Sequence, residues 1–234
     1  MSEAAISAAF FDPEGGTYGS LRAGVGVIFR GDRPEITDRS PELVPDGDGW
    51  RVALDDAELS FESLSEEMRL GGGRARVCRV RGRVSDRALD CLGTIVETGS
   101  PPAWSELDAT RWISAIFDAD HAVLAFARRP RGARGHGEEE LTGWVLDGGE
   151  LRGVEDARVS TVYDGDGRQR SARLELWLPA EDFPRRGAGE ARAGVSLALE
   201  GLNVHAAVFG WRMDGRDGIG AYELTVRDPG DAAA

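Results

Sequence analysis

The chain is divided into short segments by turns that are rich in glycine and aspartate. Such turns lie at Asp46–Gly49, Gly71–Gly73, Asp147–Gly149, Asp164–Gly167 and Asp214–Gly218. Glycine, and to a lesser degree aspartate, tolerates the positive φ that tight hairpin turns require. Turns at this spacing therefore predict strands joined by hairpins in an antiparallel meander.

The segments between the turns have the pattern of strands. Apolar and polar residues alternate in Arg170–Leu178 and in the second half of Arg74–Ser85, which is typical of a strand with one buried face. Helical periodicity is nearly absent. Because a meander buries its apolar face by closing into a barrel or stacking as a sandwich, the predicted fold class is all-β with little helix, and an internal cavity is the natural ligand site.

Similar patterns predict further strands at Ser20–Arg30, Trp50–Leu54, Glu58–Leu64, Ala88–Glu97, Arg111–Phe117, His121–Arg128, Leu141–Leu146, Ala157–Tyr163, Ala191–Leu199, Leu202–Met213 and Ala221–Arg227. Residues 31–49 contain several prolines and are expected to be irregular. Trp104–Thr110 is expected to form one helical turn, because Ser105 and Asp108 have capping-box spacing. The small polar tail, 228–234, is expected to be disordered.

The segment Thr98–Pro102 is the best candidate for an internal boundary, because it combines glycine, serine and two adjacent prolines. A chain of 234 residues can form one large β domain or two modest ones. We expect two β halves, residues 1–100 and 101–234.

Composition excludes several functions. The formal net charge is −13, which argues against nucleic acid and against adsorption to anionic membranes, since both depend on clustered positive charge. All 28 basic residues are arginine, so chemistry that needs a lysine, such as Schiff-base formation or pyridoxal phosphate attachment, is impossible.

The cysteines and the hydropathy pattern point to the cytoplasm. Cys78 and Cys91 fall on adjacent predicted strands; a disulfide is geometrically possible, but reduced, buried thiols are expected in a domain of this size. The first residues, Met1–Phe11, lack the basic and apolar regions of a signal peptide. No apolar run approaches the roughly 18 residues of a membrane span.

Metal and cofactor motifs are not found. The three histidines, His121, His136 and His205, stand far apart, and no metal-binding spacing occurs among them. Asp164–Glu175 imitates a calcium loop, but arginine and glutamine occupy positions that need a ligand and a glycine. The run His136–Glu140 is expected to be a solvated loop. No metal and no other cofactor is predicted.

Catalytic and binding motifs are equally scarce. No nucleophile elbow and no glycine-rich dinucleotide fingerprint occurs. Arg79, Arg81 and Arg83 share one strand face and could grip an anion, although a solvated face balanced by neighbouring acids is expected. Trp177 is unusual because it lies on the polar side of an alternating strand.

Three segments carry a resemblance to a known family. Phe10–Ser20 resembles the opening strand, Arg111–Asp118 the central hairpin and His205–Glu223 the closing motif of a lipocalin-like superfamily that includes carotenoid 1,2-hydratase and AttH-type proteins. The resemblance implies two packed lipocalin-like half-barrels with an apolar ligand at their junction.

Hydratases of that family protonate an isoprenoid double bond and let water trap the cation. This chemistry needs a carboxylic acid kept neutral by burial and aromatic faces that stabilise positive charge. The resemblance implies Asp108 and Glu223 as acids, His205 as a proton partner, Trp104, Trp112 and Trp211 as walls, and Arg111 as a residue that orients a carboxylate.

One departure bears on catalysis. Many relatives carry an Asp-His-Ser-Trp-Gly-like stretch before the central hairpin, whereas Glu97–Trp104 keeps only the tryptophan. If that stretch carries proton transfer in the relatives, this chain has moved the function or lost it.

Three hypotheses follow. In the first two, an apolar or terpenoid-like small molecule occupies a β-lined cavity, and the protein either hydrates, isomerises or cyclises it, or only sequesters it. In the third, the chain is a β-sandwich carbohydrate-binding module in which an exposed Trp177 stacks on sugar rings.

Overall fold

The structure is a computed structural model, and it describes residues 5–99, 102–134, 138–199 and 201–227. Within these ranges the chain forms strands and turns and contains no α-helix, which confirms the all-β prediction. No helix in the described ranges could therefore serve as a membrane span. The expected disordered tail and His136 lie outside the described residues.

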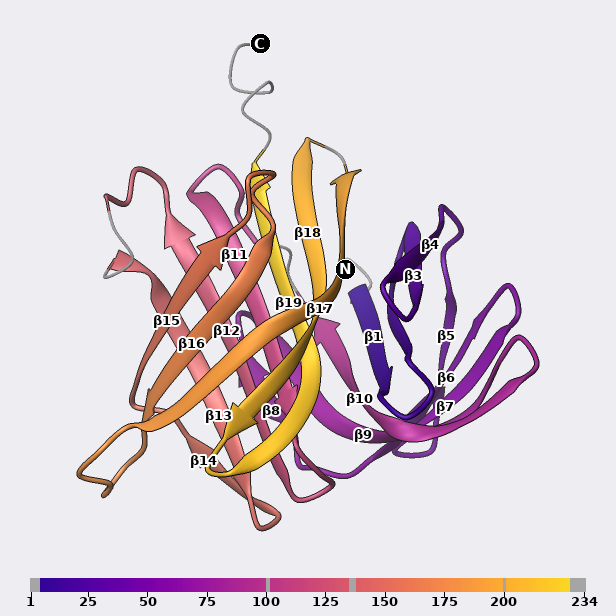
Figure 1. The fold of residues 1–234 in the computed structure, drawn as a ribbon, viewed down its shortest axis with the longest axis horizontal. Helices are drawn as coiled ribbons and strands as arrows, with labels where there is room; N and C mark the ends of the chain where they lie inside the picture. The colour runs from indigo at the N-terminus through magenta and orange to yellow at the C-terminus, as the bar shows by residue number, and fades with distance from the viewer. Residues whose placement is uncertain (1–4, 100–101, 135–137, 200, 228–234) are drawn as a thin grey trace. The chain divides into compact units, whose positions relative to one another are not determined.

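The chain divides into two compact units. The first holds the described parts of Met1–Pro101, with Asp118–Ala122 and Leu146–Leu151; the second holds the described parts of Pro102–Phe117, Val123–Val145 and Arg152–Ala234. Each unit is built on one strongly curled antiparallel sheet, a half-barrel (Figure 1).

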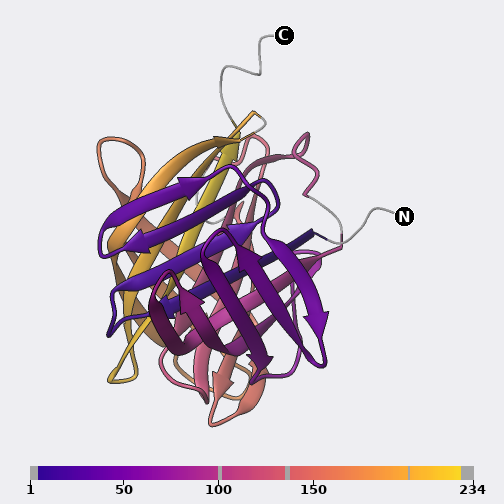
Figure 2. The same cartoon turned by 90° about the vertical axis from the view of Figure 1, so that its right-hand side faces the viewer.

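The N-terminal sheet has ten strands in the order β4-β3-β2-β1-β10-β9-β7-β6-β5, with β8 beside β9. The strands are β1 Ala5–Asp12, β2 Thr17–Arg22, β3 Val25–Arg30, β4 Arg33–Thr37, β5 Glu42–Asp46, β6 Gly49–Leu54, β7 Ala57–Ser63, β8 Met68–Leu70, β9 Gly73–Val84 and β10 Arg87–Thr98. Figure 2 shows the strong twist between its neighbouring strands. One face is apolar and buried, with Phe10, Leu59 and Val80 in its core.

The C-terminal sheet has nine strands in the order β14-β13-β12-β11-β19-β18-β17-β16-β15. The strands are β11 Leu107–Ile116, β12 His121–Pro130, β13 Glu140–Asp147, β14 Glu150–Gly153, β15 Asp156–Tyr163, β16 Gln169–Trp177, β17 Arg185–Leu199, β18 Leu202–Met213 and β19 Arg216–Arg227. In both sheets the first strand of the unit pairs with its last, β1 with β10 and β11 with β19. The two halves therefore share one connectivity.

Three local expectations are wrong. The predicted strand Ser20–Arg30 is divided by a turn at Ala23 and Gly24 into the end of β2 and the whole of β3. Residues 31–49 are not irregular but contain β4 and β5. Both strands lie at the ends of the sheet order, where Pro34 and Pro45 are tolerated because an edge strand need not donate every backbone hydrogen bond. The expected helical turn within Trp104–Thr110 is absent, because Leu107–Thr110 belongs to β11 and Ala109 pairs with Val226; pairing with β19 outweighs the local capping signal.

The cysteines behave as expected. Cys78 on β9 is buried, Cys91 on β10 is half-buried, and both thiols are free. Burial raises the pKa of each thiol to about 12. Both side chains are thus protonated, unreactive hydrophobes at neutral pH.

Irregularities in the C-terminal sheet set which side chains face its core. The register between β17 and β18 shifts between Ala191 and Ala193, and a second shift lies at Val162/Tyr163 between β15 and β16. Before the first shift, Gly189 is opposite Trp211, whose ring covers the glycine on the core side. A Cβ atom at position 189 would lie 2.5 Å from that ring.

We therefore expect Gly189→Ala to destabilise the C-terminal sheet by about 1–3 kcal/mol, because Trp211 must leave its position in a packed core. Urea unfolding, followed by tryptophan fluorescence, measures the change. Gly165→Ala is the control, since a side chain there meets no atom within 4 Å; equal stability of the two variants would contradict the packing argument.

Candidate functional site

The concave face of the C-terminal sheet carries the core and several polar groups. Ile113, Phe209 and Tyr222 belong to its buried cluster. Because side chains alternate along a strand, His205 shares this face with Phe209 and Trp211 on β18, and Arg111 shares it with Ile113 on β11. The strand register agrees, since Arg111 and His205 are each opposite Leu224 on β19.

A buried ion pair lies at one end of this face. The guanidinium of Arg111 pairs with the carboxylate of Glu139, and each side chain is only 4% exposed. Arg111 also donates a hydrogen bond of 3.3 Å to the hydroxyl oxygen of Tyr163. The expectation that His136–Glu140 is a solvated loop is therefore wrong for Glu139, because a buried arginine from a distant strand compensates for the burial of its charge.

Tyr222 and Gln169 extend this polar network. The hydroxyls of Tyr222 and Thr161 lie 2.6 Å apart, and the amide of Gln169 donates 3.1 Å hydrogen bonds to the carbonyl oxygens of His205 and Tyr222. Burial raises the pKa of Tyr222 well above its ordinary value, so its hydroxyl stays neutral. Tyr222 also packs against Phe209, with ring centroids 5.3 Å apart.

Several buried polar atoms on this face have no hydrogen-bond partner within the described residues. They include Nε of Arg111, Oε1 of Gln169 and the indole nitrogen of Trp211. An unpartnered buried donor or acceptor is costly, and a buried water molecule is the usual partner of such an atom.

His205 forms a cross-strand pair with Ser196. Its Nδ1 lies 2.8 Å from the Ser196 hydroxyl, and the two residues are directly opposite in the β17–β18 register. Burial, together with the positive charge of Arg168, lowers the pKa of His205 against a weaker opposite effect of Asp164. The imidazole is therefore neutral at pH 7.

The predicted site residues divide between two faces and a turn. Arg111, His205 and Trp211 share the concave face. Asp108, Trp112 and Glu223 share the opposite face, where Glu223 and Trp112 are paired in register. Asp108 accepts a hydrogen bond of 2.9 Å from the backbone N–H of Gly132. A carboxylate oxygen of Glu223 lies 3.5 Å from the hydroxyl oxygen of Thr225. Trp112 packs against Phe126, with ring centroids 6.4 Å apart.

Trp104 lies in the turn before β11 and is half-buried. Sequence reasoning does not select Glu139, Tyr163, Tyr222 or Gln169, because their roles depend on strand register. The only sequence signal nearby is the run of acidic residues around Glu139.

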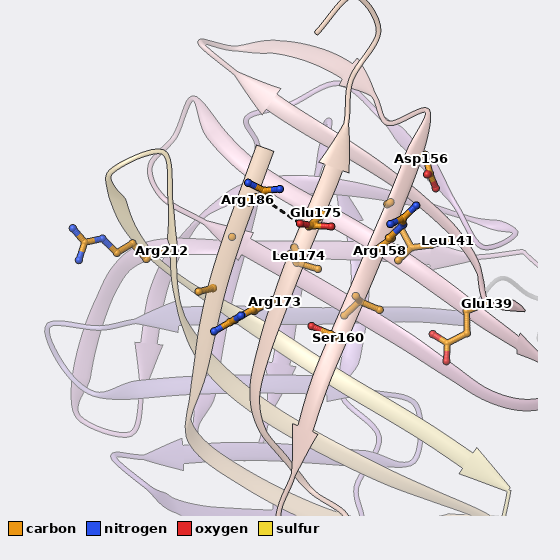
Figure 3. Close-up of a pocket in the computed structure, with 14 residues that line it drawn as sticks. Glu139, Leu141, Asp156, Arg158, Ser160, Arg173, Leu174, Glu175, Arg186 and Arg212 are labelled. Carbon is orange, nitrogen blue, oxygen red and sulfur yellow. Dashed lines mark hydrogen bonds and ion pairs between the residues drawn. The ribbon is translucent and has the colours of Figure 1, made fainter. Parts of the chain in front are cut away.

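A hollow of about 1040 Å³ adjoins this network. Its apolar lining includes Leu141 on β13, Ala157 and Val159 on β15 and Leu174 on β16, and Glu139 lies at its border. Residues on both faces of β15 line the hollow. This is possible because β15 is the last strand of the sheet order and has a free edge. Figure 3 shows the charged lining on β15, β16 and β17.

Other candidates from the sequence have structural roles. Arg79, Arg81 and Arg83 pair with Asp90, Glu62 and Glu58 at 2.8, 3.2 and 3.6 Å, so the expected balance by neighbouring acids is confirmed. Trp177 is half-buried and covered by the Arg158 guanidinium, 4.9 Å from the ring centroid. No cluster of His, Cys, Asp and Glu within the described ranges could hold a metal ion.

The two curled meanders of shared connectivity define an all-β protein built from two antiparallel half-barrels. Among solved structures, a protein assigned as an AttH from Nitrosomonas europaea has a TM-score of 0.64 and 14% identity, over 96% of this chain and 92% of that one. Kievitone hydratase from Nectria haematococca has a TM-score of 0.56 and 10% identity, over 98% and 90%. These likenesses concern the fold and confirm the resemblance at that level.

A family model described as "Domain of unknown function (DUF7064)" matches residues 77–227. The chain belongs to that family. No curated protein matches its sequence.

We expect Arg111→Met to destabilise the C-terminal unit by about 3–5 kcal/mol, because Glu139 then loses the charge that compensates for its burial. Urea unfolding measures the loss. The double variant Arg111→Met/Glu139→Met removes both charges and is expected to recover most of the stability. A single variant within 1 kcal/mol of the wild type, roughly the value of an exposed pair, would contradict the assignment.

A second expectation concerns pH. Since the folded state lowers the pKa of His205, the unfolded chain binds the proton more readily, and acidification favours unfolding. The wild type should therefore lose stability, relative to His205→Gln, as the pH falls through the ordinary histidine range near ~6.5. The free energy of unfolding of both proteins, measured at several pH values, tests this; parallel pH profiles would disprove it.

Proposed function

We propose that this protein binds an apolar small molecule with a polar group, in the hollow beside β15 of the C-terminal sheet. The observation that carries the proposal is the hollow itself, about 1040 Å³, whose lining combines apolar side chains such as Leu141 and Val159 with charged ones. A hollow of this size suits a small organic ligand, and the charged side chains of its lining suit the orientation of a polar group on that ligand.

The polar lining of the hollow supports binding of a molecule that carries an oxygen. Arg158, Ser160 and Arg173 line the hollow beside its apolar residues. A ligand carbonyl or hydroxyl would accept a hydrogen bond from one of these groups, while its apolar body would contact Leu141 and Val159. The burial of apolar surface would contribute most of the affinity.

Sequestration is favoured over acid-catalysed hydration. Kievitone hydratase shares the fold, but acid catalysis requires a carboxyl group that is kept neutral. Glu139, the carboxyl beside the hollow, is paired with Arg111, which favours its ionised form. Asp108 and Glu223, the acids that the resemblance implies, are not among the residues that line the hollow.

A carbohydrate-binding role receives less support. Stacking on sugar rings needs exposed aromatic faces, and none of the tryptophans is among the exposed large hydrophobic side chains of the described ranges. Arg158 already covers the ring of Trp177.

The neutral fluorescent probe N-phenylnaphthylamine tests the proposal. We expect it to bind the wild type with enhanced fluorescence, and Leu141→Asp to weaken binding about tenfold or more, since a buried contact worth at least 1.4 kcal/mol is lost. Leu43→Asp is the matched control, because Leu43 packs at the border of the N-terminal core in the same way.

Native mass spectrometry of protein purified from its own host would complement the probe. A lipophilic adduct in the wild type and its loss in Leu141→Asp would support the proposal. Absence of both adduct and probe binding in a folded protein would refute it.

A further inference from the structure

A row of arginines crosses the outer face of the C-terminal sheet beside the hollow. In the strand register, Arg173 on β16 is opposite Ala188 on β17, and Ala188 is opposite Arg212 on β18. Two arginines thus flank one small residue. Arg186 lies two residues from Ala188 on the same face, and all four residues line the hollow.

The outer surface at Ala188 is low because its own side chain is a single methyl group. Gly187 and Gly189, on either side of it, face the core, where Met213 and Trp211 fill the space beside them. The floor of the hollow at Ala188 therefore rests on a packed core.

The charges of this row are not balanced as they are in the N-terminal sheet. There, each of three outward arginines has an acidic partner within 3.6 Å. In the C-terminal row, Arg173 has no acidic partner among the described residues, and Arg212 has only Asp217 at 4.0 Å. Arg186 is neutralised by Glu175 at 2.9 Å, the dashed contact in Figure 3.

The acids that line the hollow do not cancel this positive charge. Glu139 is paired with Arg111 and Glu175 with Arg186. Asp156 is on β15, four residues before Ser160, which is the residue opposite Arg173; four residues of strand span ~13 Å. Arg173 is thus left without an ion-pair partner among the described residues, in a chain with a net charge of −13.

We infer that the hollow takes an amphipathic anion, whose head group binds Arg173 above Ala188 and whose apolar body extends towards Leu141. The inference rests on the proposed function and names the chemical class of its ligand. Arginine grips carboxylate, phosphate or sulfate oxygens with two parallel hydrogen bonds. Arg212, 74% exposed, is free to rotate towards the same head group, as exposed side chains do rapidly.

The distance between the arginines and the apolar end of the hollow fits the length of such a ligand. Ala188 on β17 is separated from the free edge of β15 by two strand spacings, ~10 Å. A medium-length alkyl chain covers this distance and continues to Leu141. The head group therefore stays over the arginines while the chain occupies the apolar end.

Isothermal titration calorimetry with laurate, dodecyl phosphate and dodecanol, each below its micelle concentration, tests the inference. We expect at least one anion to bind about tenfold more tightly than the neutral alcohol, and added salt to weaken only the anions. Comparison of laurate with dodecyl phosphate identifies whether a carboxylate or a phosphate is preferred.

Variants locate the head group. Arg173→Gln should remove most of the preference for the anion and leave dodecanol binding unchanged, and Ala188→Glu, which places a competing carboxylate beside Arg173, should do the same. Both positions are exposed, and thermal melting checks their folding. Arg79→Gln, an outward arginine of the N-terminal sheet, should change neither affinity.

The outcomes separate the two proposals. Equal affinity for all three probes, or a preference that survives Arg173→Gln, would overturn the inference and leave the proposed function standing. Failure of all three probes to bind folded protein would overturn both.

Discussion

The pairing of the first strand of each unit with its last strand is the constraint on which the structure depends. The ladder of β11 with β19 joins residues more than a hundred positions apart, such as Trp112 and Glu223. The remaining strands continue as a meander to either side of this ladder, and the twist between neighbouring strands, together with the bulges, curls the sheet. The curl makes one face concave, and that face collects the core. The same pairing, between β1 and β10, organises the N-terminal sheet.

The parts of the fold that could be predicted are those with local causes. Glycine and aspartate at turns such as Asp214–Gly218 mark a hairpin whatever the rest of the chain does, and alternation in Arg170–Leu178 marks a strand. β4 and β5 could not be predicted, because their prolines oppose strand formation except at an edge, and edges are defined only by the complete sheet. The start of β11 is similar, since its pairing with β19 is not a local property.

The candidate site also has parts with local causes, which the sequence can predict, and parts that depend on the strand register. Alternation shows that Arg111 and Trp112 point to opposite faces, but only the register shows that His205 lies on the face of Arg111. The burial of Glu139 has no sequence signal, because a run of acids has the composition of a solvated loop. A buried charge needs a partner, and here the partner comes from a strand that begins some thirty residues earlier. Gln169 reaches the core because of the register shift opposite it.

The shift between Ala191 and Ala193 has a consequence for the whole of β17. Before it, odd-numbered residues such as Gly189 face the core; after it, even-numbered residues such as Ser196 do. The one additional residue at this shift, Arg192, therefore reverses the alternation of side chains part of the way along β17, so that no single alternating pattern runs through the whole strand. Without Arg192, Ser196 would point outwards and His205 would lose its hydroxyl neighbour. The pairing of Ser196 with His205 at that end of the sheet thus depends on the one additional residue in β17.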